Sequence, residues 1–223
     1  MTGPGGPALS ECPAWLTAVA GLSPVVDPVW ARRPRQRPAR PGAVLILFAP
    51  GPPSADPALD TRLVLIRRAH SLRAHAGQVA FPGGALDAGD SSPAAAAVRE
   101  AGEEIGLDPR GVSVLTTWPA IDVPVSGYAV HPVLAWQDVP APLGVRQPAE
   151  VAEVFEVTIR DLIEPAHRLR VRLPEGTMGP AFRVDDRLIW GFTGGVLDRL
   201  LDLAGLAEPW AETRVEDLPV GRP

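Results

Sequence analysis

The sequence contains no lysine and only one cysteine, and both shortages exclude classes of chemistry. All 21 basic side chains among the 223 residues are arginine, so no lysine can serve a Walker phosphate-binding loop or form a Schiff base. Cys12, the single cysteine, excludes an intramolecular disulfide framework and a zinc site built from several cysteines. The histidines do not have a metal-ligand spacing such as HxxxH. The sequence also lacks the GxSxG motif that is typical of serine hydrolases.

The chain also lacks an apolar run of nearly twenty residues and an N-terminal basic segment followed by an apolar one. We therefore expect a soluble, cytoplasmic protein that does not engage a membrane. The formal net charge of −5 and the pI near 5.4 argue against a broad basic surface, so nucleic acid is not an expected partner. The length of 223 residues suits one domain with a sizeable core and peripheral elaborations.

Glycines and acids are concentrated instead in residues 77 to 107, GQVAFPGGALDAGDSSPAAAAVREAGEEIGL. Gly83 and Gly84 permit backbone conformations and close approaches that other residues forbid, and a strand is expected to end at this glycine turn. Ser92 is the expected N-cap of a helix that stops near Gly106, because serine favours the first position and glycine the last. The segment is thus predicted to be a glycine turn that feeds an acidic helix.

The expected helix carries three carboxylates on one side. At about 100° per residue, Glu100, Glu103 and Glu104 fall within roughly a third of the helix circumference, so their negative charges are crowded together. A hard divalent cation such as Mg²⁺ prefers carboxylate oxygens and would turn this repulsion into attraction. Arg99 can restrain one carboxylate, and the glycine turn offers backbone groups to a phosphate. A solvated acidic face is the alternative; the context favours a metal-dependent site that cleaves a diphosphate.

Gly84, Asp90 and the run REAGEEIGL of residues 99 to 107 resemble the Nudix box, GX5EX7REUXEEXGU. The core REUXEEXGU is intact. Asp90 stands where the family usually has Glu, and eight residues rather than seven separate it from Arg99, so the loop must absorb one extra residue. The resemblance implies an α/β fold, namely a Nudix-type α/β/α sandwich with a mixed sheet.

The same resemblance implies roles for individual acids. Glu100 and Glu104 would bind Mg²⁺ or Mn²⁺, with Glu103 as a candidate further ligand. Nudix enzymes commonly place one more Glu outside the box near the metals, and Glu150, at an expected junction of loop and strand, is the candidate. Glu103 or Glu150 would orient or deprotonate the attacking water. The residues expected to take part in catalysis are Glu103, Glu100, Arg99 and Glu150.

Residues 65 to 84, LIRRAHSLRAHAGQVAFPGG, resemble the additional signature of the coenzyme A pyrophosphatase branch of the Nudix hydrolases. Ile66 replaces the Thr that the branch usually carries. The residues expected to contact substrate are Arg73, His75, Gly77, Gly83 and Gly84. For His75 a structural role is an equal alternative, and for Arg73 the alternative is an ion pair with Asp87 that shapes the loop.

The branch resemblance implies a reaction. We expect the chain to cleave the diphosphate of coenzyme A or its derivatives, with Mg²⁺ or Mn²⁺, to 3′,5′-ADP and 4′-phosphopantetheine. One alternative is a Nudix pyrophosphatase that acts on ADP-ribose, a dinucleotide or an oxidised nucleotide. A second is a catalytically silent nucleotide-binding module, which the complete REAGEE run disfavours. The expected partner is a small nucleotide, and the oligomeric state is left open, with a homodimer as one option.

Hydrophobic patterning outlines the other elements and the domain limits. Strands are expected at 43–49, 63–67, 112–118, 128–136 and 150–159, with a loop at 122–127. Helices are expected at 15–22, 159–164 and 189–203, and a hairpin joins 169–173 to 181–184. The expected units are an N-terminal Pro/Arg-rich extension that can hold a short helix (1–41), a Nudix hydrolase domain (42–205) and a C-terminal tail (206–223).

Overall fold

The computed structural model of the chain describes residues 12–22, 39–52, 56–72, 75–123, 126–139, 141–173 and 176–218. In this part of the chain an eight-stranded sheet has the order β3-β2-β1-β7-β5, with β4 beside β1, β6 beside β7 and β8 beside β2. Its strands are β1 (Arg40–Ala49), β2 (Arg62–Arg68), β3 (Val79–Ala80), β4 (Gly83–Ala85), β5 (Val112–Thr117), β6 (Ile121–Val123), β7 (Tyr128–Gln137) and β8 (Val151–Thr158). Because β1 and β7 run parallel while the other pairs are antiparallel, the sheet is mixed.

Strand β1 is covered on both faces. Leu45 and Leu47 belong to the core beneath α2 (Pro93–Ile105), whereas Ile46 and Phe48 belong to the core on the opposite side. Successive side chains of a strand point to opposite faces, so a strand buried on both sides needs the unbroken apolar run that this sequence contains.

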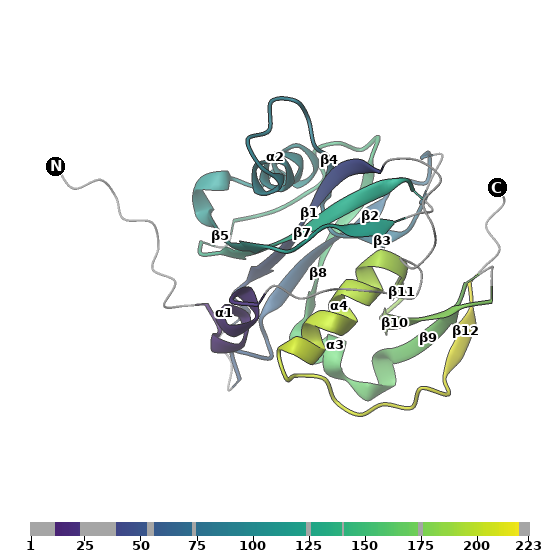
Figure 1. Cartoon of the computed structure of the whole chain (residues 1–223). Helices are drawn as coiled ribbons and strands as arrows, with labels where there is room; N and C mark the ends of the chain where they lie inside the picture. Colours follow the sequence, from purple (N-terminus) through teal and green to yellow (C-terminus); the bar gives the residue numbers. More distant parts are fainter. Residues whose placement is uncertain are drawn as a thin grey trace.

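Helices lie on both sides of the sheet (Figure 1), which confirms the expected α/β/α arrangement. On one side α2 packs with small alanine side chains, which let the helix approach the strands closely. On the other side lie apolar residues of three helices, α1 (Ala14–Ala20), α3 (Ile159–Ile163) and α4 (Gly191–Leu203). In the described residues, no helix is long and apolar enough to cross a membrane.

A smaller four-stranded sheet follows in the chain and lies beside α4 (Figure 1), again counting only the described residues. Its strands, in the order β11-β10-β9-β12, are β9 (Arg168–Arg172), β10 (Met178–Val184), β11 (Arg187–Ile189) and β12 (Val215–Asp217). The short helices η3 (Pro109–Gly111) and η4 (Pro165–His167) precede β5 and β9. The hairpin expected from the sequence is confirmed as β9 and β10.

Two local expectations need correction. Strand β3 ends at Ala80, just before the glycine turn, but Gly83–Ala85 is itself a strand, β4, which pairs with β1. The loop expected at 122–127 begins instead inside a strand, since Ile121–Val123 forms β6 along β7. Both strands have only three residues, and their pairing depends on a distant partner strand rather than on local propensity.

Candidate active site

The acidic helix α2 begins and ends where the sequence predicts. The side chain of Ser92 accepts a hydrogen bond from the backbone N–H of Ala95 (3.1 Å), and Pro93 occupies the first helical position. Gly106 ends the helix in the left-handed conformation, with φ of 75°, which glycine adopts without strain. These local signals set the limits of the helix, and its packing on the sheet sets the direction of its acids.

The three acids of α2 differ strongly in exposure. Glu104 is buried with 1% of its surface exposed, the Glu100 side chain is 17% exposed and the Glu103 side chain is 54% exposed. The face is therefore graded from core to solvent and is not a uniformly solvated acidic surface.

Glu104 lies at the inner end of this gradient. Its carboxylate accepts a hydrogen bond from the backbone N–H of Gly83 at 2.8 Å. Burial raises the pKa of Glu104 to about 7; the negative charges of Glu100 and Glu150 act in the same direction, while the Gly83 hydrogen bond and the charge of Arg68 oppose it. Burial likewise raises the pKa of Glu100. The negative charges of Glu103 and Glu150 raise this pKa further, whereas Arg99 lowers it. Glu150, which lies just before β8, thus acts electrostatically on two acids of α2.

Strand β4 brings backbone against these acids. Gly83 has φ of 147°, and a Cβ there would lie 2.4 Å from the carbonyl oxygen of Ala43 in β1. A Cβ on Gly84 would lie 2.6 Å from the Glu100 carboxyl carbon. Both positions need glycine, one because of the sheet and the other because of the carboxylate.

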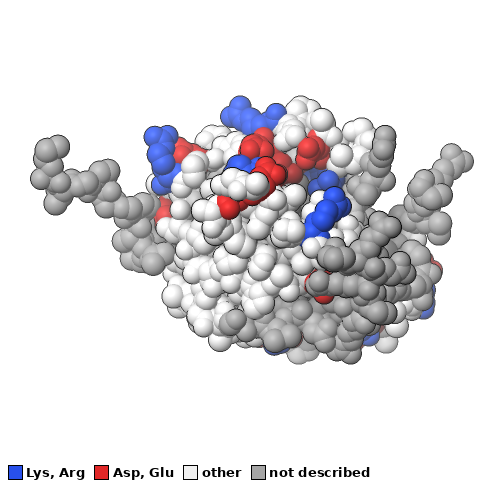
Figure 2. Space-filling model, turned by 45° about the horizontal axis from the view of Figure 1, so that its top comes forward, with Lys and Arg blue, Asp and Glu red and all other residues white. Residues whose placement is uncertain are grey.

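Arg99 binds several acceptors at once. Its Nε and Nη2 donate to the two carboxylate oxygens of Asp90 (3.1 and 3.0 Å), and Nη1 donates to Glu100 (3.0 Å) and Glu103 (3.3 Å). Nη2 also donates to the carbonyl of Ala85 in β4 (3.3 Å). Figure 2 shows this mixture of Arg with Asp and Glu gathered on the face that carries α2. Arg99 therefore ties the helix acids to the loop and to β4.

Asp90 binds the longer loop to its own backbone and to Arg99. Its side chain, 7% exposed, accepts a hydrogen bond from the backbone N–H of Asp87 (2.8 Å) and forms the bidentate pair with Arg99. The Arg99 hydrogen bonds lower the pKa of Asp90. Asp87 also pairs with Arg99 at 3.5 Å, so the acid considered as a partner of Arg73 is engaged by another arginine. Asp90 thus braces Arg99 rather than facing the cavity.

Replacement of Asp90 by Ala should free Arg99 and loosen the carboxylates of Glu100 and Glu103. Losses of groups that orient a metal site typically cost about 10–100-fold in affinity or activity, and we expect kcat/KM to fall by that amount with little change in melting temperature. The matched control is Asp108→Ala, which removes an exposed pair with Arg110 outside the site. Equal activity of the two variants would show that Asp90 has no positioning role.

A cavity of about 730 Å³ opens beside these acids, and its lining mixes charged with apolar side chains. Its volume lies in the range of small-molecule and cofactor sites. The polar and glycine residues of the lining include Arg68, Gly83, Gly84, Arg99, Glu100, Glu103, Gln147 and Glu150. The apolar and aromatic residues include Val79, Val123, Tyr128, Val130, Leu173, Trp190 and Phe192.

The start of α4 also contributes to the lining of this cavity. Trp190 and Phe192 line the cavity, and the Thr193 hydroxyl donates to the carbonyl of Val79 (3.2 Å). The segment from Trp190 to Thr193 is therefore part of the wall and is tied to β3.

Arg68 is a cavity residue that the sequence-based site did not include. Successive side chains of a strand point to opposite faces, and Arg68 continues the face of Val64 and Ile66 toward α2. Arg67 pairs with Glu153 at 3.2 Å, whereas Arg68 lines the cavity, with its Nε buried and without a hydrogen-bond partner in the described chain. The sequence signal for Arg68 was its place in the upstream signature of residues 65 to 84.

The other expected contacts lie around the same cavity. His75 lines it, has φ of 58° and shares a hydrogen bond with the side chain of Gln78 (2.9 Å). Gly77 does not line it; with φ of 70°, it shapes the turn before β3, and a Cβ there would meet His70 at 2.7 Å. Glu150 lines the cavity and accepts a hydrogen bond from Gln147 (2.8 Å). Arg73 lies outside the described residues.

A family model described as the NUDIX domain matches residues 55–176, more than half of the chain. The chain belongs to the Nudix family. The protein named Uncharacterized Nudix hydrolase NudL from Cronobacter sakazakii is 38% identical over 145 residues, covering 62% of this chain and 72% of the relative. NudL of Escherichia coli K12 is 38% identical over 146 residues, with the same coverage. Among solved structures, the Nudix hydrolase RenU of M. smegmatis aligns with a TM-score of 0.44 and 29% identity, covering 54% of this chain and 71% of RenU.

Nudix hydrolases act on phosphorus-containing anhydrides and generally use divalent metal ions, so the donor set of this member must be compared with that need. Carboxylates of Glu100, Glu103, Glu104 and Glu150 supply only oxygen donors, the type that a hard cation prefers. Among the described residues, however, no three His, Cys, Asp or Glu side chains are arranged to hold an ion as they stand. Glu100 and Glu103 are turned toward Arg99, and Glu104 toward Gly83. The donor chemistry fits a divalent cation, and holding one requires these carboxylates to rotate.

Proposed function

We propose that this Nudix hydrolase cleaves the diphosphate of coenzyme A or its derivatives, giving 3′,5′-ADP and 4′-phosphopantetheine, with Mg²⁺ or Mn²⁺ as cofactor. The observation that carries the proposal is that the two sequence signatures meet at one cavity: Arg68, Gly83 and Gly84 of the upstream signature line it together with Glu100 of the box helix. The proposed catalytic domain spans residues 42–205.

Glu100 and Glu104 are the proposed metal ligands, with Glu103 as a further ligand. A bound Mg²⁺ or Mn²⁺ would offset the diphosphate charge and lower the pKa of a coordinated water. Glu104 is bonded to Gly83, and Glu100 and Glu103 are bonded to Arg99, so a bound cation would have to replace some of these hydrogen bonds as the carboxylates rotate toward it. Glu103 or Glu150 would orient the water or accept its proton, since both line the cavity.

Arg68 and β4 supply the groups for the phosphates. The Arg68 guanidinium is a cation in a cavity rich in carboxylates, and a planar guanidinium matches phosphate oxygens in a bidentate geometry. The glycines of β4 leave room for β1 at Gly83 and for the Glu100 carboxylate at Gly84, so their backbone lies directly against the acids where a phosphate is proposed to bind. His75 lies at the same wall and is a proposed further contact.

The lining of the cavity supports a substrate with both charged and apolar parts. It includes the acids and Arg68 together with apolar and aromatic side chains from several strands and from the start of α4. Coenzyme A combines a diphosphate and a phosphorylated nucleoside with a pantetheine arm, and such a substrate can use both kinds of lining.

A substrate panel tests the proposal. Coenzyme A, an acyl derivative, ADP-ribose, a dinucleotide and an oxidised nucleoside triphosphate are incubated with enzyme and Mg²⁺ or Mn²⁺, and products are separated by mass spectrometry. We expect kcat/KM for coenzyme A to exceed that for ADP-ribose by about tenfold or more, the ratio that ~1.4 kcal/mol of differential binding gives. A higher kcat/KM on ADP-ribose or the dinucleotide would replace the proposed substrate with that alternative.

A further inference from the structure

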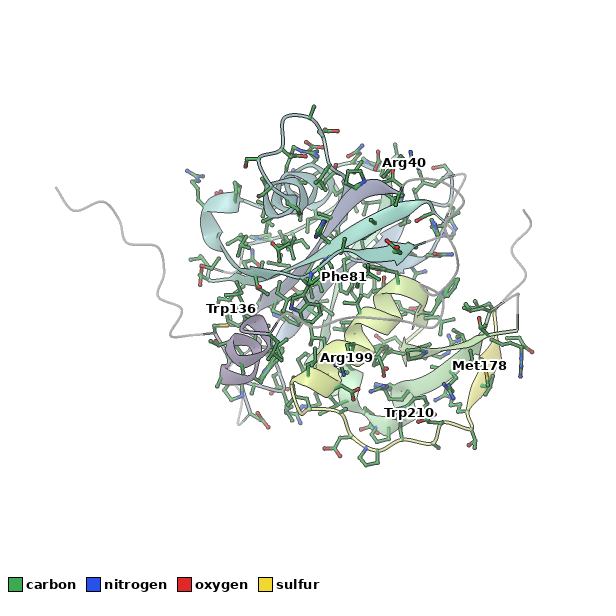
Figure 3. The ribbon with its side chains drawn as sticks, viewed as in Figure 1. Arg40, Phe81, Trp136, Met178, Arg199 and Trp210 are labelled. Atoms are coloured by element: carbon green, nitrogen blue, oxygen red, sulfur yellow. The ribbon has the colours of Figure 1, made fainter. Side chains whose placement is uncertain are left out.

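An arginine stacked on the chain's single tyrosine stands at the start of two neighbouring strands. Arg40 begins β1 and Tyr128 begins β7, and the parallel register sets these two residues opposite each other. The Arg40 guanidinium carbon lies 4.3 Å from the centre of the Tyr128 ring. The backbone N–H of Arg40 also donates to the carbonyl of Gly127 at 2.9 Å, which ties the two strand starts together. Figure 3 labels Arg40 at this end of β1.

The tyrosine ring is held against the sheet. A Cβ on Gly42 would lie 3.2 Å from the Tyr128 ring and 3.1 Å from the carbonyl oxygen of Gly84, so the ring uses the space that glycine leaves open. Gly42 pairs with β4 on one side and with β7 on the other. The ring therefore has a defined place on the wall of the cavity, next to β4, and gives the guanidinium a rigid support.

The two arginines at this part of the molecule differ in what they bind. Arg99 is saturated by carboxylates and a carbonyl. Arg40 is exposed, and with the described residues its guanidinium forms only the stacking contact on Tyr128. Stacking leaves the N–H groups at the rim of the guanidinium available to an acceptor, and the fork of donors matches a phosphate.

We propose that Arg40, supported by Tyr128, is a specificity-determining residue that binds a second anionic group of the substrate, a phosphomonoester on the ribose. This inference rests on the proposed function and adds a subsite to it. The acids of α2 repel any phosphate that is not neutralised by a metal, so a substrate with an additional phosphomonoester needs a cation for that group away from these acids. Arg40 supplies that cation, because it stacks on Tyr128, which lines the same cavity.

Product binding tests the subsite without turnover. Calorimetry compares 3′,5′-ADP with 5′-AMP, which lacks the 3′-phosphate, on the wild type, Arg40→Gln and Arg199→Gln. The control removes an arginine on α4 that pairs with Asp202 and does not line the cavity (Figure 3). We expect the wild type and the control to prefer 3′,5′-ADP by about 10–100-fold, as for a charged hydrogen bond, and Arg40→Gln to lose most of that preference. A preference unchanged in Arg40→Gln would overturn the inference.

Kinetics give a second readout. Arg40→Gln should raise KM for coenzyme A with kcat nearly unchanged and leave both constants for 3′-dephospho-coenzyme A unchanged, because the contact is present equally in ground and transition states. An equal loss on both substrates would overturn the subsite. If the wild type hydrolyses neither substrate but Arg40→Gln still abolishes the preference for 3′,5′-ADP, the proposed function fails and the subsite stands.

Discussion

Replacement of Glu104 by Gln should lower kcat/KM at saturating Mg²⁺ by on the order of 10³-fold, because the amide keeps the shape of the side chain and loses the charge proposed to hold a cation. The fold should be retained, since the Gln carbonyl oxygen can accept the hydrogen bond that Gly83 now donates to Glu104. The buried carboxylate is unfavourable without a cation, as its raised pKa of about 7 indicates, so removing the charge should not destabilise the metal-free protein.

Melting temperatures with and without metal distinguish this effect from misfolding. A cation that binds only the folded state raises the melting temperature of the wild type, and this rise should disappear in Glu104→Gln. Glu208→Gln makes the same chemical change at an exposed position and should keep both the rise and the activity. Wild-type activity of Glu104→Gln at saturating Mg²⁺ would refute the assignment of α2 as the metal platform.

Replacement of Gly83 by Ala should destabilise the protein by about 3 kcal/mol or more. The new Cβ would lie 2.4 Å from the Ala43 carbonyl oxygen and 2.6 Å from the Val44 Cα, and neither backbone atom can move without disturbing β1, the central strand. The φ of 147° adds strain for any residue with a side chain, typically about 1–3 kcal/mol. Urea unfolding measures the loss, and activity should fall with it because the Gly83 amide contacts Glu104.

Gly84→Ala is the matched variant and should behave differently. The atoms that its Cβ would approach belong to the end of the Glu100 side chain, which can swing aside. We expect a stability loss below about 1 kcal/mol and an activity loss of about 10–100-fold, since a displaced carboxylate no longer points where the site needs it. Equal destabilisation by the two substitutions would contradict the role of β4 as a strand locked onto β1.

The fold was predictable where local signals decide the structure. The limits of α2 follow from Ser92, Pro93 and Gly106, because capping and helix termination depend on neighbouring backbone groups. The strands β4 and β6 were not predictable, since three residues with glycine or proline nearby resemble a turn until the partner strand is known. The pairing of Val215–Asp217 with β9 likewise joins segments far apart in the sequence.

The candidate site, like the fold, could be predicted from the sequence only in part. Helical periodicity placed Glu100, Glu103 and Glu104 on one side of α2, but their graded burial depends on how the helix packs on the sheet. Strand alternation places Arg68 on the same face as Val64 and Ile66, but the sequence alone does not show that α2 and the cavity lie on that face. The stacking of Arg40 on Tyr128 requires the parallel pairing of two distant strands.

The first turn of α4 has a further consequence. Trp190 and Phe192 line the cavity, yet they lie beyond the segment 55–176 that the family model matches. The carboxylates proposed for the reaction and Tyr128 lie inside the matched segment, whereas these two aromatic side chains of the wall lie outside it. A part of the chain that the family model does not describe therefore completes the binding surface, and the family match alone does not define which substrates fit.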